Sequence, residues 1–385
     1  MTDYSFIPMR RRNFLAAATA VALPAQNSPN GFRPLFDGST LRGWQIEQGP
    51  ESAFYVQDGA IVIHEGSGYP AWLRTEQEFE NFELRGEMFI KGWANSGIYL
   101  HAPRYGRPTW CGMKINIFQK QDDPPLAESM GAIFPVIAPR KVNVKAKGEW
   151  NTFRVRMDWP RFQLWINEEL VQDLDCRQTL ELRYRLRRGY VGLESLSYPV
   201  RFRGLEIKEL PSSEQWQVLY AQPGDLAAHW RSEDREILEK SKWETIGGIL
   251  RGEQLGYLAT KEEFSDFDLQ MYVRASRHSN GGIYFRCPRA QKGDHYEIQI
   301  HDVEGAVYPT GSLYGLKRAT YPVMETEKWF LFQMHLQGSH CLVRINGDTV
   351  MEYRGMQNLA AGPVMLQAHQ LGKWIEYQDV KIRRL

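Results

Sequence analysis

Hydrophobic and polar residues alternate along most of the chain, in short runs separated by Gly, Asn, Asp and Pro. A period of two interrupted by turn-forming residues predicts β-strands, and no long run has the period of a helix. In the segment 295–302, Tyr296, Ile298 and Ile300 point to one side of the predicted strand. The other side carries four titratable or amide residues: His295, Glu297, Gln299 and His301. Such a face is either a solvated sheet surface or a set of groups that bind ligands and transfer protons.

The same order of features occurs twice, in residues 32–210 and 221–385. For example, the sequence NSGIY at 95–99 matches NGGIY at 280–284. Each copy has roughly 160 to 180 residues, enough for a two-sheet sandwich with its own core. The polar, turn-prone residues 211–214 join the copies. The pattern therefore predicts an all-β protein of two tandem sandwich domains.

The first 25 residues have the features of an export signal. Three arginines, Arg10 to Arg12, precede Phe14, Leu15 and a short apolar run that ends in small residues. The Arg11-Arg12-x-Phe14-Leu15 pattern is similar to a twin-arginine signal, which exports folded proteins. An ordinary secretory signal or an uncleaved amphipathic anchor are the alternatives. We expect a periplasmic or secreted protein without an integral membrane segment after cleavage, because no other apolar run approaches about 18 residues.

Composition narrows the class of partner. The chain has 385 residues, a formal net charge of +1 and 43% hydrophobic residues, which fits folded domains rather than disorder. Without a basic block there is no electrostatic footprint for nucleic acid. The 12 tryptophans and 18 tyrosines suit β-rich domains, in which they fill the core or stack on sugars.

The four cysteines are dispersed and have no CxxC spacing, so they signal neither zinc nor redox chemistry. One disulfide in each domain and free packed thiols are both open.

Several ordered motifs together resemble the 3-keto-disaccharide hydrolase domain family. They are GFRPLFDGSTLRGW at 31–44, NGGIYFR at 280–286, YEIQIHD at 296–302, TGSLYG at 310–315 and LQAH at 366–369. The resemblance implies a concanavalin-like jelly roll in each copy, with the ligand on the concave sheet. It also implies exported enzymes that cleave glycosides whose C3 hydroxyl has been oxidised to a ketone.

The two copies differ where the chemistry would lie. Lys114 stands in place of Glu297, Gln119 in place of Asp302 and Leu196 in place of His369. The first copy keeps three polar residues of the pattern and adds a histidine: Asn95, Tyr99, Glu194 and His101. We therefore expect the catalytic site in the second copy. The first copy is predicted to be structural, sugar-binding or a wall of the same cleft.

A ketone at C3 acidifies the hydrogen on C2, so a base can remove that proton and the substituent on C1 can leave. Glu297 and His369 are the candidate bases, since burial raises a carboxylate pKa and imidazole titrates near neutrality. Asp302 is a third catalytic candidate that could orient His369, or it is a turn carboxylate. The predicted substrate-binding residues are Asn280, Tyr284, Arg286, Gln299, His301, Tyr314 and Gln367. A surface salt bridge is the alternative for Arg286, which we expect to share a strand face with Tyr284.

No cofactor is firmly indicated. A divalent metal is possible, because Glu297, His301, Asp302 and His369 offer oxygen and nitrogen ligands, but there is no HxH or HExxH spacing. The sequence thus predicts an enzyme that cleaves 3-keto-glycosides or 3-keto-disaccharides by C2 deprotonation, elimination and hydration. The alternative is a non-catalytic, lectin-like carbohydrate-binding protein on the same scaffold.

Overall fold

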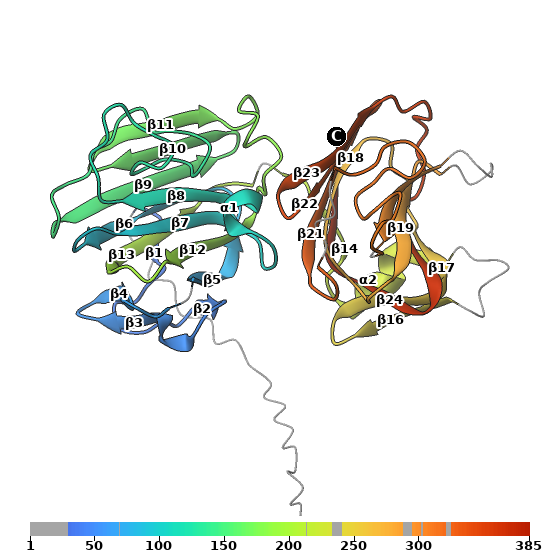
Figure 1. Cartoon of the computed structure of the whole chain (residues 1–385), viewed down its shortest axis with the longest axis horizontal. Coiled ribbons are helices and arrows are strands. Elements are labelled where there is room, and N and C mark those ends of the chain that lie inside the picture. The colour runs from blue at the N-terminus through green and yellow to red at the C-terminus, as the bar shows by residue number, and fades with distance from the viewer. Residues whose placement is uncertain are drawn as a thin grey trace, which may run out of the picture.

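The computed structural model describes residues 30–68, 70–212, 214–232, 241–287, 295–301, 303–320 and 325–385. Their regular secondary structure is almost entirely β-strand and forms two sandwiches that lie side by side, coloured blue to green and yellow to red in Figure 1. The predicted all-β fold of two tandem jelly-roll domains is confirmed. The predicted export signal, residues 1–25, lies outside the described residues. Within the described ranges, no helix is both long and apolar enough to cross a bilayer.

The first domain consists of two antiparallel sheets. One has the order β11 (Glu169–Asp175), β10 (Arg161–Ile166), β9 (Trp150–Asp158), β6 (Phe82–Ile90), β13 (Val200–Glu209), β4 (Ala60–Ile63) and β3 (Phe54–Gln57), with β1 (Arg33–Pro34) also paired to β13. The other has the order β2 (Trp44–Glu47), β5 (Ala71–Phe79), β12 (Gly189–Ser195), β7 (Asn95–Ala102) and β8 (Met113–Phe118). Two short helical segments, η1 (Glu51–Ala53) and α1 (Pro108–Cys111), connect strands.

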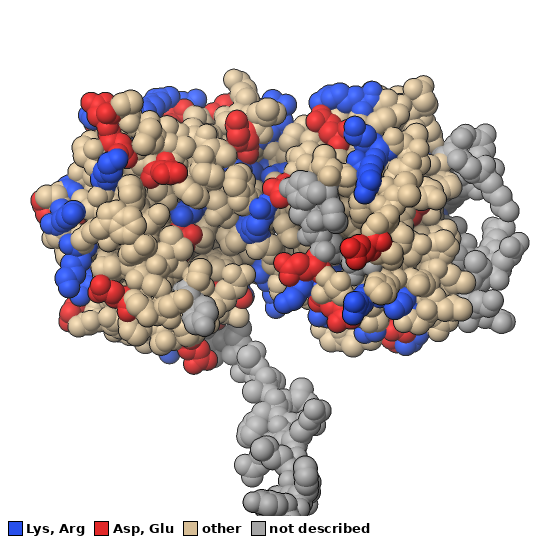
Figure 2. Space-filling model, viewed as in Figure 1, with Lys and Arg blue, Asp and Glu red and all other residues tan. Residues whose placement is uncertain are grey.

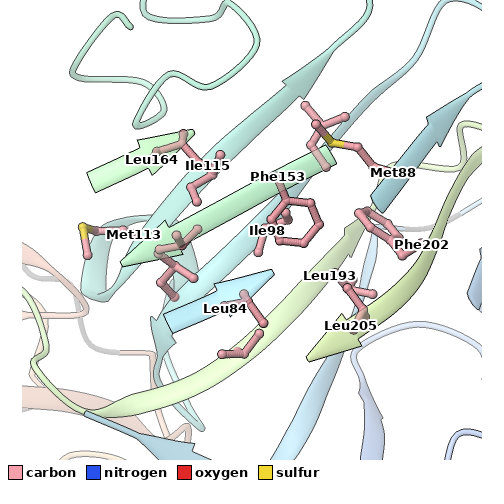
Figure 3. Packing of buried hydrophobic residues seen from close by; sticks show 14 of the residues in the cluster. Leu84, Met88, Ile98, Met113, Ile115, Phe153, Leu164, Leu193, Phe202 and Leu205 are labelled. Atoms are coloured by element: carbon pink, nitrogen blue, oxygen red, sulfur yellow. The ribbon is translucent and has the colours of Figure 1, made fainter. Parts of the chain in front are cut away.

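The core of the first domain lies between its two sheets (Figure 3). Alternate residues of β6 and β9, such as Leu84, Met88 and Phe153, meet Ile98 of β7 and Leu193 of β12. All five are at most 3% exposed. Their spacing of two places every second side chain of a strand in this layer. The other set of side chains on each strand points outward, where a functional face can form.

The second domain forms one continuous sheet system in the described residues. Its elements are β14 (Gln217–Tyr220), α2 (Pro223–His229), β15 (Trp230–Ser232), β16 (Ser241–Ile246), β17 (Ile249–Thr260), β18 (Phe267–Ala275), β19 (Asn280–Phe285), β20 (Tyr296–His301), β21 (Phe330–Gln337), β22 (His340–Ile345), β23 (Asp348–Arg354) and β24 (Met365–Arg384).

One strand, β24, links the two layers of this domain. Its first residues pair with β19, while its later residues pair with β18 and β14. β17 pairs with β24 from Ala259 to Leu250, and its register shifts at Gln254. Gln254 and Gly372 both have positive φ, at 67° and 72°, so the backbone bends where the two strands pass between layers. In the first domain two separate strands, β12 and β13, take the places of the early and late parts of β24, and each belongs to a different sheet.

The domains contact each other through the outer side of β18 and β21. The Tyr272 hydroxyl accepts a hydrogen bond from the Arg104 backbone N–H at 2.8 Å, and Trp329 stacks on Tyr105 with ring centroids 5.6 Å apart. Gly347 approaches the chain at Trp110 so closely that a Cβ would lie 2.5 Å from a backbone carbonyl carbon. Residues of both domains therefore pack closely against each other at this contact.

A cavity of about 330 Å³ lies at this interface. Two of its arginines, Arg187 and Arg383, form ion pairs with Glu214.

The four cysteines are free thiols, and only Cys287 is not fully buried. Of the two alternatives, the structure therefore shows free packed thiols rather than disulfides. Figure 2 shows acidic and basic side chains interspersed over the face in view.

Candidate functional site

Four neighbouring strands of the second domain bring the predicted residues onto one face. Tyr284 of β19 lies opposite Glu297 of β20, and Gly282 lies between Gln299 of β20 and Gln367 of β24. Because side chains alternate along each strand, the outward residues of these strands share a surface. We call it the polar face: Tyr257, Asn280, Tyr284, Glu297, Gln299, His301, Gln367 and His369.

The polar face is not an ordinary solvated sheet surface. Gln299 is 4%, Gln367 3% and Tyr284 8% exposed, although all three point away from the hydrophobic core. Burying amide and hydroxyl groups costs free energy unless they find partners, so such groups are unusual on a face with no role. The alternating side of β20 behaves as predicted, since Ile298 and Ile300 are fully buried in the core.

The Glu297 carboxylate lies directly over Gly282. A Cβ placed on Gly282 would be 2.3 Å from Glu297 Oε1 and 2.9 Å from its Cδ. Because Gly282 has no side chain, the Glu297 carboxylate can occupy the space above it. Burial raises the pKa of Glu297 from 4.5 to about 7, against a smaller opposing effect of a hydrogen bond from Tyr284. A carboxylate with this pKa can act as a base near neutral pH.

A chain of hydrogen bonds holds this carboxylate. Gln367 Nε2 donates to the Tyr257 hydroxyl at 2.8 Å. The hydroxyls of Tyr257 and Tyr284 are hydrogen-bonded, and Tyr284 is hydrogen-bonded to Glu297. Since an amide nitrogen only donates, each hydrogen bond in the chain has one direction: Gln367 donates to Tyr257, Tyr257 donates to Tyr284, and Tyr284 donates to the carboxylate. Burial and the Glu297 charge raise the pKa of Tyr284, so it stays a neutral donor.

Two amides beside the carboxylate offer further polar atoms. Gln299 Nε2 donates to Asn280 Oδ1 at 2.6 Å, which fixes both side chains. Gln367 Oε1 is buried and has no hydrogen-bonding partner among the described residues. A hydroxyl arriving from a ligand would satisfy that acceptor.

Aromatic rings border the Glu297 end of the face. The Tyr314 backbone N–H donates to the Glu297 carbonyl at 2.9 Å, and the Tyr314 side chain is 57% exposed. Its ring lies 5.2 Å from that of Tyr308. The exposed His295 ring lies 5.1 Å from Tyr284. Tyr314 is therefore tied through its backbone to the strand that carries Glu297, and its predicted contact with a sugar ring stays a prediction.

His369 shares the face but lies far from Glu297. Tyr284 pairs with Glu297 on one side and Met365 on the other, so His369 is two strands and four residues away. That separation corresponds to roughly 16 Å between Cα atoms, from ~4.8 Å per strand and ~3.3 Å per residue. His369 is exposed, whereas Glu297 is half-buried. The two groups cannot exchange a proton directly.

The predicted place of Arg286 is wrong. Arg286 follows the end of β19 and has a φ of 50°, which breaks the alternation that would place it beside Tyr284. Its side chain is 0% exposed and pairs with Asp266 at 2.8 Å. It also donates to the carbonyls of Ser265 and Asn358. Arg286 holds loops of the domain together and is not on the polar face.

Asp302 lies outside the described residues, so its predicted role stays a prediction. In the part of the chain that the structure describes, no three His, Cys, Asp or Glu side chains gather as metal ligands. His301 is half-buried, and its backbone N–H donates to Thr310 Oγ1 at 2.9 Å.

The first domain carries a different set of groups at the same positions. Lys114 pairs in register with Tyr99, as Glu297 does with Tyr284. Its ammonium forms an ion pair with Glu194 at 2.5 Å, and the Tyr99 hydroxyl donates to the same carboxylate at 2.6 Å. Lys114, Glu194 and Tyr99 are all less than 10% exposed.

His101 is not part of this set. Its ring is buried against the carbonyls of Glu80 and Leu186, and burial lowers its pKa to about 4.

The first domain does not form a wall of the polar face. It contacts the second domain through Tyr272 of β18 and Trp329 next to β21, in the layer opposite to β19 and β20. That part of the prediction is wrong.

Tyr257 is the functional candidate that the sequence did not single out. It aligns with Trp72, which pairs with Glu194 in the first domain as Tyr257 pairs with Gln367 in the second. The presence of an aromatic residue at this position in both repeats, Trp72 and Tyr257, is the sequence feature that could have identified it.

Comparison with known proteins supports the sequence resemblance. The family described as the 3-keto-alpha-glucoside-1,2-lyase-like domain matches residues 31–208 and 215–383. No curated protein sequence matches the chain.

Among solved structures, a candidate glycosyl hydrolase from Parabacteroides distasonis is 20% identical, with 49% of this chain and 99% of that chain covered and a TM-score of 0.42. The carbohydrate-binding module CBM66 from Bacillus subtilis is 13% identical, covering 40% and 94%, with a TM-score of 0.30. The β-glucanase of Bacillus licheniformis is 8% identical, covering 46% and 100%, with a TM-score of 0.33.

Proposed function

This chain belongs to the 3-keto-alpha-glucoside-1,2-lyase-like domain family, and we propose that its second domain cleaves the glycosidic bond of 3-keto-glycosides. The family match supports this substrate class. The placement of the reaction on the second domain rests on the polar face, because the first domain has Lys114 where the second has Glu297.

The proposed reaction begins with removal of the proton on C2. The electrons of the C2–H bond form a C2–C3 double bond, and the C3 ketone becomes an enolate oxygen. When the enolate collapses back to a ketone, a C1–C2 double bond forms and the C1–O bond breaks, and the departing oxygen takes up the proton that the base removed from C2 and leaves as the alcohol. Water then adds across the C1–C2 double bond, with OH on C1 and H on C2. No oxocarbenium ion is involved, so two carboxylates at a fixed separation are not required.

In this scheme Glu297 is the base that accepts the C2 proton. Tyr284 and Tyr257 orient its carboxylate, and Gln367 Oε1 accepts a hydrogen bond from a sugar hydroxyl. Tyr314 packs against the sugar ring. His369, at the distant end of the face, lies too far from Glu297 to act at C2 or at the adjacent C1–O bond, so it has no proton-transfer role in this scheme.

One observation carries the proposal: a carboxylate with a pKa of about 7 is held over a glycine by a chain of hydrogen bonds. A protein that only binds sugars has no need of a poised base.

The test is to incubate the full chain with a 3-keto-glucoside and, separately, with the unoxidised glucoside. Release of the alcohol from the oxidised sugar alone supports the proposal. Turnover of the plain glucoside would indicate a conventional glycosidase, and binding without turnover of either would leave the lectin-like alternative.

The pH dependence follows from Glu297. A base works when ionised, so kcat/KM should fall as the pH falls through about 7, with a limb that reflects one proton. Tyr284→Phe removes a hydrogen bond that lowers this pKa, so it should move the limb to higher pH. A limb near the ordinary Glu value of 4.5 in the wild type would contradict the assignment.

We also propose export through the Arg11-Arg12 segment. Replacing both arginines by lysine keeps the charge but alters the twin-arginine pattern, so the protein should accumulate in the cytoplasm. Fractionation of expressing cells measures this, and unchanged export would point to an ordinary secretory signal.

A further inference from the structure

Three aromatic residues gather at one edge of the first domain's five-stranded sheet. Trp93 lies in the loop before β7, and its ring centroid is 4.8 Å from Tyr198 and 6.0 Å from Phe118. Both neighbouring rings are nearly perpendicular to it, at 84° and 83°. Trp93 nevertheless remains 57% exposed. A large ring held at a fixed angle with more than half of its surface in water is suited to contact a flat apolar surface.

The loops that carry these rings are anchored. Next to Trp93, Ala94 is fully buried, and its carbonyl accepts a hydrogen bond from the Gln119 N–H at 3.4 Å. Next to Tyr198, the Ser197 hydroxyl is hydrogen-bonded to Ser67 at 2.9 Å. The aromatic platform is thus preorganised, which lowers the entropy cost of binding.

Polar groups continue from the platform along the same face of the sheet. Phe118 pairs in register with Asn95, and Asn116 and Lys114 follow at alternate positions of β8. Asn95 Oδ1 and Asn116 Oδ1 are both buried without a hydrogen-bonding partner among the described residues. Two orphaned amide acceptors beside an aromatic platform form the combination that recognises hydroxyl groups on a ring with an apolar face.

This face has no free base. Glu194 is bound by Lys114 at 2.5 Å and by Tyr99 at 2.6 Å, and the charges of the ion pair cancel. The equivalent positions in the second domain lack the large apolar rings, since Trp93, Phe118 and Tyr198 align with His278, His301 and Leu371. The same scaffold therefore presents reactive groups in one domain and rings in the other.

We propose that the first domain binds an unoxidised, neutral oligosaccharide on the platform of Trp93, Tyr198 and Phe118, without cleaving it. Neutral charge fits a face whose ammonium and carboxylate are already paired. This site is separate from the polar face, which is reserved for the oxidised sugar. Its existence does not depend on turnover by Glu297.

The test measures binding of maltotetraose, cellotetraose, laminaritetraose and xylotetraose to the full chain by calorimetry. Trp93→Ala should weaken binding of the recognised sugar about tenfold or more, since it removes the ring that supplies most of the exposed apolar surface of the platform. Trp93→Phe keeps a ring and should retain most of the affinity. Leu180→Ala removes another exposed apolar side chain of the same domain, 70% exposed, and should change nothing.

The Glu297→Gln variant separates this site from the polar face. Retained binding in that variant, together with loss in Trp93→Ala, supports the proposal. No binding of any of the four sugars would overturn it. So would affinity that survives Trp93→Ala, or binding that disappears in Glu297→Gln. Thermal unfolding of each variant shows whether a loss of binding reflects unfolding, and the Trp93→Phe variant decides the matter if the alanine variant is unstable.

Discussion

Glu297→Gln should lower kcat/KM on a 3-keto-glucoside by about 10³-fold, within the range of roughly 10²- to 10⁴-fold typical of general bases. Glutamine has nearly the same shape and can still meet the Tyr284 hydroxyl, but it cannot accept the C2 proton. Steady-state kinetics at pH 8, where the wild-type carboxylate is ionised, measures the effect. A variant that turns over like the wild type would remove Glu297 from the mechanism.

Stability provides the control for this variant. The folded-state pKa of Glu297 is about 7 against an ordinary 4.5, so the folded protein binds more protons than the unfolded chain between these values. Stability therefore falls as the pH rises through this window, and the loss remains above it. Glutamine carries no such charge, so Glu297→Gln should unfold at a higher temperature than the wild type at pH 8. A lower unfolding temperature would mean that lost turnover reflects damage to the fold.

Gly282→Ala should lower kcat/KM about 10²-fold while preserving the fold. Gly282 is in a strand, and its φ is outside the positive region, so alanine is compatible with the backbone. The new methyl group would collide with the Glu297 carboxylate, which must swing away from its position. Displacing a reacting group by about 1 Å can cost this much rate.

Gly97→Ala is the matched control in the first domain. There a Cβ would meet Lys114 Cε at 2.5 Å, so the variant causes a similar displacement of the side chain on the paired strand. Turnover should stay at the wild-type level, because the carboxylate of the second domain is untouched. Equal losses in both variants would contradict the division of roles between the domains.

The sequence predicted the part of the site that strand alternation controls. Glu297, Gln299 and His301 share one side of β20, and Gln367 and His369 share one side of β24, as a period of two requires. The repeat also predicted that Lys114 replaces Glu297, and the paired registers of the two domains confirm that equivalence.

The failures have physical causes that a linear pattern does not contain. Alternation placed Arg286 beside Tyr284, but a positive φ just after the strand turned its side chain into the domain. Tyr257 and Gln367 are 110 residues apart in the sequence, so only the pairing of their strands brings the Tyr257 hydroxyl to Gln367. The distance between Glu297 and His369 depends on the order of strands across the sheet, which periodicity does not reveal.

The position of β24 also governs when the polar face can exist during synthesis. Gln367 lies on this strand and is needed beside Gly282, yet β24 is the last strand of its domain to leave the ribosome. Until then the strand that lies between β19 and β17 is missing. A nascent chain that stops short of Met365 therefore has Glu297 and Tyr284 on paired strands, but it lacks Gln367 and the strand that holds Tyr257 beside them. The second domain must therefore complete its folding after translation of β24, whereas all strands of the first domain have already been made.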